Sequence, residues 1–307
     1  MAETNPKDKK NLPANFRSGY IAIVGRPNVG KSTLLNHILG EKVAIVSPKP
    51  QTTRNRITGI RTTESSQIVF LDTPGIHQGH SLMNRRMVDT AMQTLDEVDG
   101  VLWLLDAHER IKQEEERIAE TLRGVETPVL ILLNKIDLVS KGKLLPLMER
   151  CAQLLPGKEI VPVSARQGDG IELILDGVEK WLPEGSPFFT DGEYTDQTER
   201  FLASEIVREK VFLLTHEEIP YGVAVTIDEF TEKEEKNLIV IAATIHTERD
   251  SHKGILIGKR GAMLKEIGQQ ARQELEALLG CRIFLELFVR VDPGWTQNPN
   301  MLVEMGL

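Results

Sequence analysis

The sequence predicts an α/β fold, a doubly wound and mostly parallel sheet with helices on both faces, followed by a smaller α+β domain. Between residues 19 and 181, short apolar runs alternate with longer amphipathic segments, which is the pattern of strand–helix repeats. The runs Val101–Leu105 and Val129–Leu133 are apolar without alternation, as in strands buried on both faces of a parallel sheet. After a stretch rich in proline and glycine at residues 182–195, the order of expected elements changes.

Each expected strand of the first domain is a short apolar run. In order, the strands are Tyr20–Val24, Gln67–Leu71, Gly100–Leu105, Pro128–Asn134 and Glu159–Val163. The segments between them are amphipathic and are expected to be helices, at Lys31–Leu39, Leu82–Leu95, Gln113–Arg123, Lys143–Leu154 and Ile171–Trp181. Regular alternation of strand and helix favours a doubly wound domain.

The second half has a different order of elements: helix, strand, strand, a short helical segment before the glycine-rich turn, helix and strand. The expected elements are a helix at Thr198–Leu214, strands at Gly222–Phe230 and Asn237–His246, a helix at Ala262–Leu279 and a strand at Arg282–Val291. We therefore expect a leader at 1–17, an α/β domain at 18–185, a linker at 186–197, an α+β domain at 198–295 and a tail with few core signals at 296–307.

Composition narrows the possible functions. The chain has 307 residues, a formal net charge of −8 and two cysteines. An acidic protein does not coat nucleic acid by bulk electrostatics, so any nucleic-acid site must be a local basic patch. The two cysteines are far apart and suit neither a disulfide framework nor zinc. No apolar run approaches the ~20 residues that span a bilayer, and the polar segment Met1–Arg17 lacks the apolar stretch of a signal peptide. We expect a cytoplasmic monomer.

A glycine-rich loop joins the first expected strand to the first expected helix. It reads Gly25-Arg26-Pro27-Asn28-Val29-Gly30-Lys31-Ser32 and fits G-x-x-x-x-G-K-[ST], the P-loop, in its required context. The glycines let main-chain N–H groups turn inward around phosphates, and the helix start adds positive dipole. Lys31 is expected to bridge the β- and γ-phosphates and Ser32 to bind Mg²⁺. A glycine turn that only connects strand and helix is the weaker alternative.

Two further motifs select a metal-bound guanine nucleotide. Asp72-Thr73-Pro74-Gly75 follows a strand, where a carboxylate can hold Mg²⁺ and Gly75 can turn its N–H to the γ-phosphate. Asn134-Lys135-Ile136-Asp137 closes another strand, and the Asp137 carboxylate can accept both N1–H and the N2 amine of guanine, whereas adenine leaves it unpaired. Asn134 is expected to tie the base site to the P-loop, and Lys135 to lie over the base. Ser164-Ala165 follows the last strand, and the Ala165 N–H is expected to meet guanine O6. The residues expected to contact GTP or GDP are Gly25–Thr33, Asp72–Ile76, Asn134, Lys135, Asp137, Ser164 and Ala165.

Together with Pro50-Gln51-Thr52-Thr53-Arg54, these motifs resemble the GTPase core of the Era family. Glu205–Lys210 and Ile257-Gly258-Lys259-Arg260-Gly261 resemble the helix and the G-x-x-G loop of that family's C-terminal KH domain (type II). The resemblance runs from about Gly19 to Trp295. It implies a GTPase that binds small-subunit (16S) ribosomal RNA near its 3′ end and assists rRNA maturation and small ribosomal subunit assembly. It also implies loose inner-membrane contact in some bacteria.

The same resemblance implies roles for residues that spacing alone does not settle. Thr52 or Thr53 is implied as the switch threonine that closes on Mg²⁺ and the γ-phosphate, and the expected metal ligands are Ser32, Thr53 and Asp72. Asn28 matches an asparagine that helps hold a monovalent cation such as K⁺ in related GTPases. Ras-like GTPases orient the attacking water with a glutamine after D-x-x-G, but this chain has Ile76 there. Catalysis is therefore assigned to Lys31, Thr52 or Thr53, and Gly75, with slow basal hydrolysis that K⁺ or a ribosomal partner accelerates.

The G-x-x-G loop predicts an RNA site in the second domain, because in a KH module such a loop clamps the backbone of about four nucleotides. The expected RNA-binding residues are Lys253, Ile257, Gly258, Lys259, Arg260, Gly261, Lys265 and Arg272. The apolar run Ile255–Ile257 is expected to line a platform for unstacked bases. Two alternatives stay open: an RNA-tethering scaffold with a largely structural nucleotide, and a GTPase acting on tRNA modification or membranes, which would share only the first domain.

Overall fold

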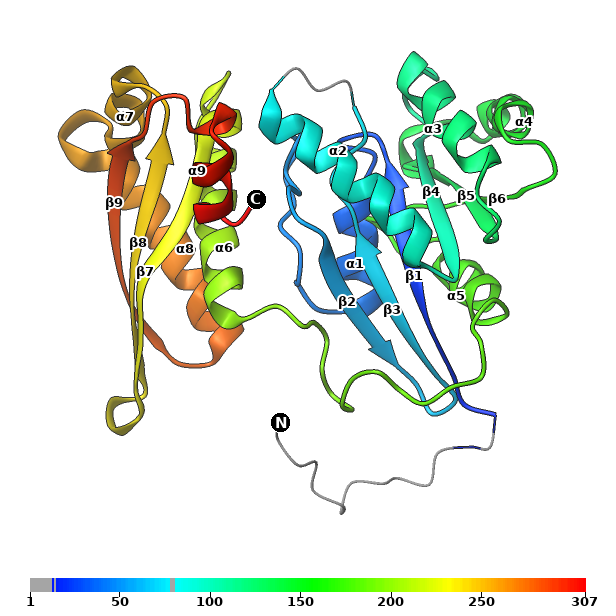
Figure 1. The fold of residues 1–307 in the computed structure, drawn as a ribbon, viewed down its shortest axis with the longest axis horizontal. Coiled ribbons are helices and arrows are strands. Elements are labelled where there is room, and N and C mark those ends of the chain that lie inside the picture. Colours follow the sequence, from blue (N-terminus) through cyan, green and yellow to red (C-terminus); the bar gives the residue numbers. More distant parts are fainter. Residues whose placement is uncertain (1–12, 14, 78–80) are drawn as a thin grey trace.

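The computed structural model describes residues 13, 15–77 and 81–307, which form two domains side by side (Figure 1). The expected leader at 1–17 lies almost entirely outside these residues. The fold class expected from the sequence is confirmed: a doubly wound α/β domain precedes a smaller α+β domain.

The first domain is built on a six-stranded sheet with the order β2-β3-β1-β4-β5-β6. Its parallel strands are β1 (Arg17–Gly25), β3 (Ser66–Asp72), β4 (Gly100–Asp106), β5 (Val129–Asn134) and β6 (Glu159–Pro162). Helices α1 (Lys31–Leu39) and α5 (Ile171–Glu179) cover one face, and α2 (Leu82–Thr94), α3 (Gln113–Arg123) and α4 (Leu144–Leu154) lie on the other (Figure 1). Buried residues on both sides of the sheet form two core clusters, so the carboxyl ends of the strands are rigidly placed.

One strand of this sheet was not expected. β2 (Ile57–Thr62) pairs antiparallel with β3 at the edge of the sheet. Its sequence, Ile-Thr-Gly-Ile-Arg-Thr, contains a central glycine, and glycine weakens a strand signal. The glycine has a packing reason, because a Cβ at Gly59 would come 2.5 Å from Leu35 Cδ1 of α1.

The second domain has a three-stranded sheet with the order β7-β8-β9. β7 (Val223–Lys233) and β8 (Leu238–Thr247) form an antiparallel hairpin, and β9 (Arg282–Val291) runs parallel to β8. Helices α6 (Glu199–Leu214) and α8 (Ala262–Leu279) pack over one shared core. The short α7 (Asp250–Ile257) precedes α8. The 3-10 turns are η1 (Leu95–Glu97), η2 (Ile136–Leu138), η3 (Lys141–Lys143), η4 (Ile219–Gly222), η5 (Glu234–Lys236), η6 (Lys259–Gly261) and η7 (Trp295–Gln297).

The segment after β9 is more ordered than its sequence suggested. It ends in the helix α9 (Pro299–Glu304), in which Leu302 is fully buried. Trp295, also fully buried, packs with Leu302 against Met83 and Met87 of α2 in the first domain. The sequence of this short tail gave little indication of a buried core, because its few apolar residues pack into a hydrophobic cluster that also includes residues of α2 and β7. Within the part of the chain that the structure describes, no helix has the length and apolar character needed to cross a membrane.

Candidate functional site

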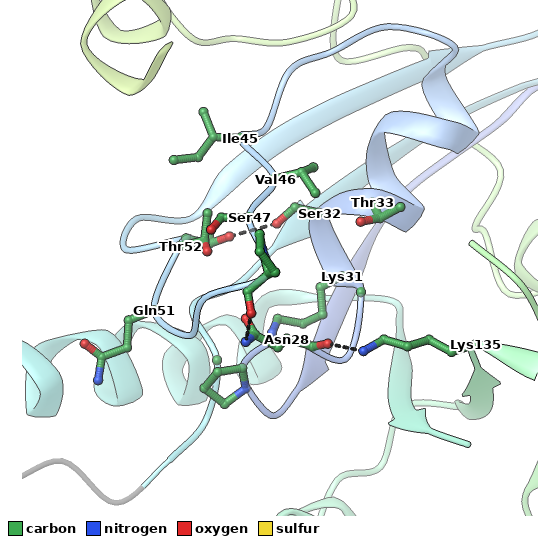
Figure 2. A pocket seen from close by; sticks show the side chains of 15 residues that line it. Asn28, Lys31, Ser32, Thr33, Ile45, Val46, Ser47, Gln51, Thr52 and Lys135 are labelled. Atoms are coloured by element: carbon green, nitrogen blue, oxygen red, sulfur yellow. Dashed lines mark hydrogen bonds between the residues drawn. The ribbon is translucent and has the colours of Figure 1, made fainter. Parts of the chain in front are cut away.

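The expected phosphate loop lies at the carboxyl end of β1 and lines a cavity of about 300 Å³ (Figure 2). Gly25, Asn28 and Gly30 have φ angles of 150°, 64° and 104°, which turn the loop around the cavity. A Cβ at Gly30 would lie 2.3 Å from the Asn134 amide nitrogen, so only glycine fits.

Lys31 lies at the base of this cavity. Its side chain is buried, and Nζ donates to the main-chain oxygens of Gly25 (3.3 Å) and Arg26 (3.0 Å). Burial lowers the pKa of Lys31 to about 8, and the nearby Asp72 carboxylate opposes this shift. An anion placed above the loop would raise the pKa of Lys31 again, because it favours the charged ammonium.

Two side chains of the predicted nucleotide set turn away from the cavity. The Arg26 guanidinium donates to Glu109 Oε2 (2.7 Å) and to Glu115, on the side of α3. Only the main chain of Arg26 is therefore available to a phosphate. Ile76 packs its side chain into the core beneath α3, in keeping with its inability to orient water.

Three side-chain oxygen atoms that could bind a metal ion lie close together at the start of α1. Ser32 Oγ lies 2.6 Å from Asp72 Oδ2 and 2.8 Å from Thr53 Oγ1. Thr52 instead donates its hydroxyl to the Lys49 carbonyl at 2.7 Å, so the geometry favours Thr53 as the switch threonine. Burial raises the pKa of Asp72 to about 6, and among the described residues its Oδ1 has no hydrogen-bond partner. A buried carboxylate with an unpaired oxygen beside two hydroxyls fits Mg²⁺, a hard cation that prefers oxygen.

The expected base site is assembled on the loops that follow β5 and β6. Asn134 Nδ2 donates to the Val29 carbonyl (2.7 Å), which ties this site to the P-loop as expected. Lys135 Nζ donates to the Asn28 carbonyl at 2.7 Å (Figure 2) and to Asp106 Oδ2 at 2.6 Å. The acidic residue that ends β4 was missed in the sequence, although its position at a strand end was a usable signal. Ser164 Oγ donates to Asp137 Oδ1 (2.7 Å) and fixes the carboxylate.

One expected contact of the base site is already made within the protein. The Ala165 N–H, predicted to meet guanine O6, donates to Asn134 Oδ1 at 2.9 Å. Both groups are buried, and a buried amide oxygen requires a donor. An O6 contact would therefore have to share the Ala165 N–H with Asn134.

The loop that carries Thr53 is also held by the second domain. Arg208 of α6 donates Nη2 to the Thr52 carbonyl at 2.6 Å. Arg54 donates to the carbonyls of Val223 (2.6 Å) and Tyr221 (3.0 Å), at the start of β7. Both guanidinium groups lie over the Phe212 ring, with Cζ–centroid distances of 5.8 Å for Arg54 and 5.3 Å for Arg208. The expected switch segment therefore contacts Ser32 of the candidate metal site and the second domain through adjacent residues.

The G-x-x-G loop lies between α7 and α8, as expected. Gly258, Arg260 and Gly261 have φ angles of 72°, 53° and 79°, and Lys259 and Arg260 are exposed. A Cβ at Gly258 would come 2.7 Å from Met263 Cβ, so the tight turn requires glycine.

A groove of about 510 Å³ continues from this loop between α8 and β9. Lys265 and Arg272 line it, together with residues that the sequence did not indicate: Leu264, Gly268, Gln269, Ile283, Phe284, Leu285 and Leu287. β9 is an edge strand, and an edge strand offers unpaired main-chain groups to a ligand. Gly268 gives a signal in retrospect, because its Cβ would lie 3.3 Å from Leu287 Cδ1 and glycine permits this close approach.

The expected platform at Ile255–Ile257 is wrong. These residues belong to α7, where Leu256 is fully buried in the core and Ile255 is half-exposed. Neither Lys253 nor Ile257 lines the groove. The helical segment expected before the glycine loop is confirmed as α7, and one turn of this helix directs Leu256 into the core.

The fold and the site together define a P-loop GTPase domain joined to a KH-type domain. A family model described as a 50S ribosome-binding GTPase matches residues 20–135, and a KH domain model matches residues 218–296. The chain is 53% identical to GTPase Era of Geobacter metallireducens over 291 residues, which are 95% of this chain and 98% of the relative. It is 54% identical to GTPase Era of Syntrophus aciditrophicus, over 95% of both chains.

Two solved structures match over nearly the whole chain. Era in complex with MgGDPNP and nucleotides 1506–1542 of 16S ribosomal RNA has a TM-score of 0.91 at 43% identity and covers 95% of this chain and 99% of that one. A single-residue variant of Aquifex aeolicus Era bound to GDP·AlF4⁻ gives the same TM-score, identity and coverage. This chain belongs to the Era family of GTPases, and the reaction it catalyses is the hydrolysis of GTP.

Proposed function

We propose that this protein is a GTP-hydrolysing switch that binds 16S ribosomal RNA through its KH domain and assists rRNA maturation and small ribosomal subunit assembly. The observation that supports the proposal is the presence in one chain of two features: a pocket lined by Lys31 and Ser32, with Asp72 hydrogen-bonded to Ser32, and a groove between α8 and β9 lined by Lys265 and Arg272. A relative of the same fold was solved with MgGDPNP and a 16S RNA fragment. The proposed functional units are 18–185 for GTP and 198–295 for RNA, with Mg²⁺ held by Ser32, Thr53 and Asp72.

The RNA part of the proposal is tested with a Lys259→Ala/Arg260→Ala double variant. Both side chains are exposed on the G-x-x-G loop, where they would meet phosphates, so their removal should weaken binding without changing sequence preference. We expect the affinity for a 3′-terminal 16S RNA fragment to fall by about 10- to 100-fold, and the slope of log affinity against log salt to shrink by about 2. Fluorescence anisotropy over a salt series measures both quantities.

A matched control for this variant is Lys141→Ala/Lys143→Ala, which removes two exposed charges from the first domain. The control should bind the RNA as the unmodified protein does. Equal RNA affinity for both double variants would place the RNA elsewhere on the surface.

We also propose that the nucleotide state reaches the KH domain through the switch segment. Thr53 lies at the metal site, and the next residue, Arg54, is buried against the start of β7. The Arg54 guanidinium donates hydrogen bonds to the carbonyls of Pro220, Tyr221 and Val223, all in the second domain, so these contacts exist only in the docked arrangement. A γ-phosphate that closes Thr53 onto Mg²⁺ thereby also places Arg54 for docking.

Arg54→Ala is expected to uncouple the two ligands while leaving each site intact. Coupling energies between sites correspond to about 5- to 150-fold in affinity, so the ratio of RNA affinities with a GTP analogue and with GDP should fall at least about fivefold. Arg56→Ala is the matched control, because Arg56 is more exposed and pairs with Glu97 of its own domain. An unchanged affinity ratio in Arg54→Ala would contradict this route.

The rate of GTP turnover distinguishes a GTP-hydrolysing switch from an RNA-tethering scaffold with a structural nucleotide. A switch protein should release phosphate faster when small ribosomal subunits are added, whereas a scaffold with a structural nucleotide should not. The same assay in KCl and NaCl tests K⁺ as a cofactor. Asn28 donates Nδ2 to the Pro48 carbonyl at 2.6 Å, which leaves its Oδ1 as the oxygen for such a cation. Equal rates in the two salts would remove K⁺ from the proposal.

The proposed setting is the cytoplasm, with the protein as a monomer that binds the small ribosomal subunit and makes loose contact with the inner membrane. We propose the cytoplasm because ribosomal RNA, the proposed partner, is found there. Cosedimentation of the purified protein with vesicles and with small subunits, alongside a mass measurement in solution, tests each of these points.

A further inference from the structure

A pair of hydrogen-bonded side chains joins the two loops that frame the outer side of the nucleotide pocket. Gln51 lies in the loop between α1 and β2, and its Nε2 is 3.1 Å from Nε2 of His77. His77 follows Gly75 by two residues, and its Nδ1 is 2.7 Å from the Gly75 carbonyl oxygen. The loop that carries the switch threonine is thereby linked to the Asp72–Gly75 motif.

The protonation of this pair is set by its partners. A carbonyl oxygen only accepts, so His77 Nδ1 carries a proton and donates to Gly75. In the neutral imidazole Nε2 is then an acceptor, and the Gln51 amide group must present its NH₂ to it. The amide is therefore held in one orientation, with its nitrogen toward His77.

The backbone at Gln51 is strained, and its neighbours hold it in place. Its φ is 61°, in the left-handed region that disfavours residues with a Cβ. The next residue, Thr52, is fixed at its carbonyl by Arg208 (2.6 Å) and at its hydroxyl by the Lys49 carbonyl (2.7 Å). Strain of this kind persists where surrounding contacts over-determine the conformation, and it gathers at functional sites.

The pair reaches the two residues that flank the γ-phosphate position. Thr53 is two residues beyond Gln51 and lies 2.8 Å from Ser32. Gly75 lines the pocket beside Pro27, and a Cβ on Gly75 would come 2.6 Å from the Pro27 nitrogen, so this close approach of the two loops requires glycine. Ile76 donates its N–H to the Gly25 carbonyl at 3.1 Å and directs its side chain into the core, so it contributes no side-chain polar group.

We propose that Gln51 and His77 are positioning residues for GTP hydrolysis, whose bridge holds Thr53 and Gly75 at the spacing the transition state requires. Figure 2 shows the Gln51 side chain at the rim of the pocket, directed away from Lys31. The pair therefore acts through the two loops and does not touch the reacting atoms. It fixes the main-chain N–H of Gly75 and the Thr53 hydroxyl, which the chain uses in place of a water-orienting glutamine.

The test is single-turnover hydrolysis of preloaded GTP by Gln51→Ala, His77→Ala and the double variant, with GTP affinity measured separately. One lost hydrogen bond corresponds to about a fivefold effect. Each single variant should hydrolyse GTP about fivefold more slowly with GTP affinity within about twofold of the unmodified protein, since only the transition state uses the bridge. The double variant should be no slower than either single variant, because the two residues act as one unit. His216→Ala, an exposed histidine after α6, is the control.

Gln51→Asn separates the bridge from the backbone conformation. Asparagine tolerates the left-handed region better than other residues with a Cβ, but its amide is one methylene shorter and no longer spans the gap to His77. We expect Gln51→Asn to be as slow as Gln51→Ala. The proposal is overturned if Gln51→Asn hydrolyses GTP at the unmodified rate, if the single variants are within about twofold of that rate, or if their effects add. A loss of GTP affinity that matches the loss of rate would also overturn it, by assigning the pair to binding.

Discussion

Replacing Asp137 by asparagine is expected to lower the affinity for GTP by about 100-fold or more and to reverse the choice of base in favour of XTP. The carboxylate can accept two hydrogen bonds from guanine, and a site built around such bonds rejects partners that leave them unpaired. In this protein Ser164 Oγ donates to Asp137 Oδ1 at 2.7 Å. In the variant, the hydroxyl of Ser164 orients the amide oxygen toward itself, so the NH₂ group faces the base.

That orientation explains why the base preference should reverse. Guanine presents its N2 amine to residue 137, so the NH₂ group of an asparagine would face a second hydrogen-bond donor and no hydrogen bond could form. Xanthine carries a carbonyl oxygen at the same position and accepts the hydrogen bond. Competition of GTP, XTP and ATP against a fluorescent guanine nucleotide measures all three affinities. Asp96→Asn, which neutralises an exposed carboxylate on the turn after α2, is the control. If ATP gained as much as XTP, Asp137 would not be the group that reads the base.

Sequence motifs predict the phosphate-loop part of the pocket because its geometry is local, whereas the lining residues Ile45, Val46, Ser47 and Pro48 were not predicted. The turn of the loop depends on glycine positions within Gly25–Ser32, and β3 and β5, which lead into the motifs at Asp72 and Asn134, are buried along their whole length. The features that the sequence did not predict depend on contacts with residues far away in the chain. The direction of Arg26 is set by Glu115, which is 89 residues away in the chain. The choice between Thr52 and Thr53 depends on Ser32 and Asp72, and nothing in two adjacent threonines distinguishes them.

For the groove between α8 and β9, the sequence predicted the glycine loop and the basic residues Lys265 and Arg272 but not the apolar residues that line it. The groove is made by one face of α8 and the edge of β9, and no local pattern shows which strand will lie at an edge. The same holds for α9, whose single fully buried leucine packs against α2 of the other domain. Elements stabilised mainly by contacts from elsewhere in the chain carry weak signals of their own.

Four consecutive residues, Gln51 to Arg54, each contact a different part of the molecule. Gln51 contacts His77, Thr52 accepts from Arg208, Thr53 lies against Ser32, and Arg54 donates to Val223. One short segment therefore meets the second switch loop, the KH domain and the metal site. Because Thr52 and Arg54 are both hydrogen-bonded to the second domain, displacement of Thr53 from Ser32 should disturb these neighbouring contacts. Binding linkage is reciprocal, so RNA that favours the docked KH domain should also favour GTP.

Lys31→Met is expected to reduce hydrolysis by about a thousandfold and to abolish a proton uptake that accompanies GTP binding. A preorganised donor at the site of developing charge contributes about 100- to 1,000-fold to a rate, and this ammonium would face both terminal phosphates. Methionine keeps the apolar stem and removes only the charge, so the pocket should stay folded. Lys180→Met, on the exposed end of α5, is the control.

The proton uptake follows from the lowered pKa of Lys31, which burial brings to about 8. The fraction of neutral Lys31 increases as the pH rises through this pKa. Above a pH of about 8, Lys31 is therefore uncharged in much of the protein. A bound triphosphate favours the ammonium and raises its pKa again, so GTP binding just above that pH takes up a proton and GTP affinity falls as pH rises further. Titration calorimetry in buffers of different ionisation enthalpy measures this uptake. If the unmodified protein and Lys31→Met took up the same number of protons, the charge that responds to GTP would belong to another group.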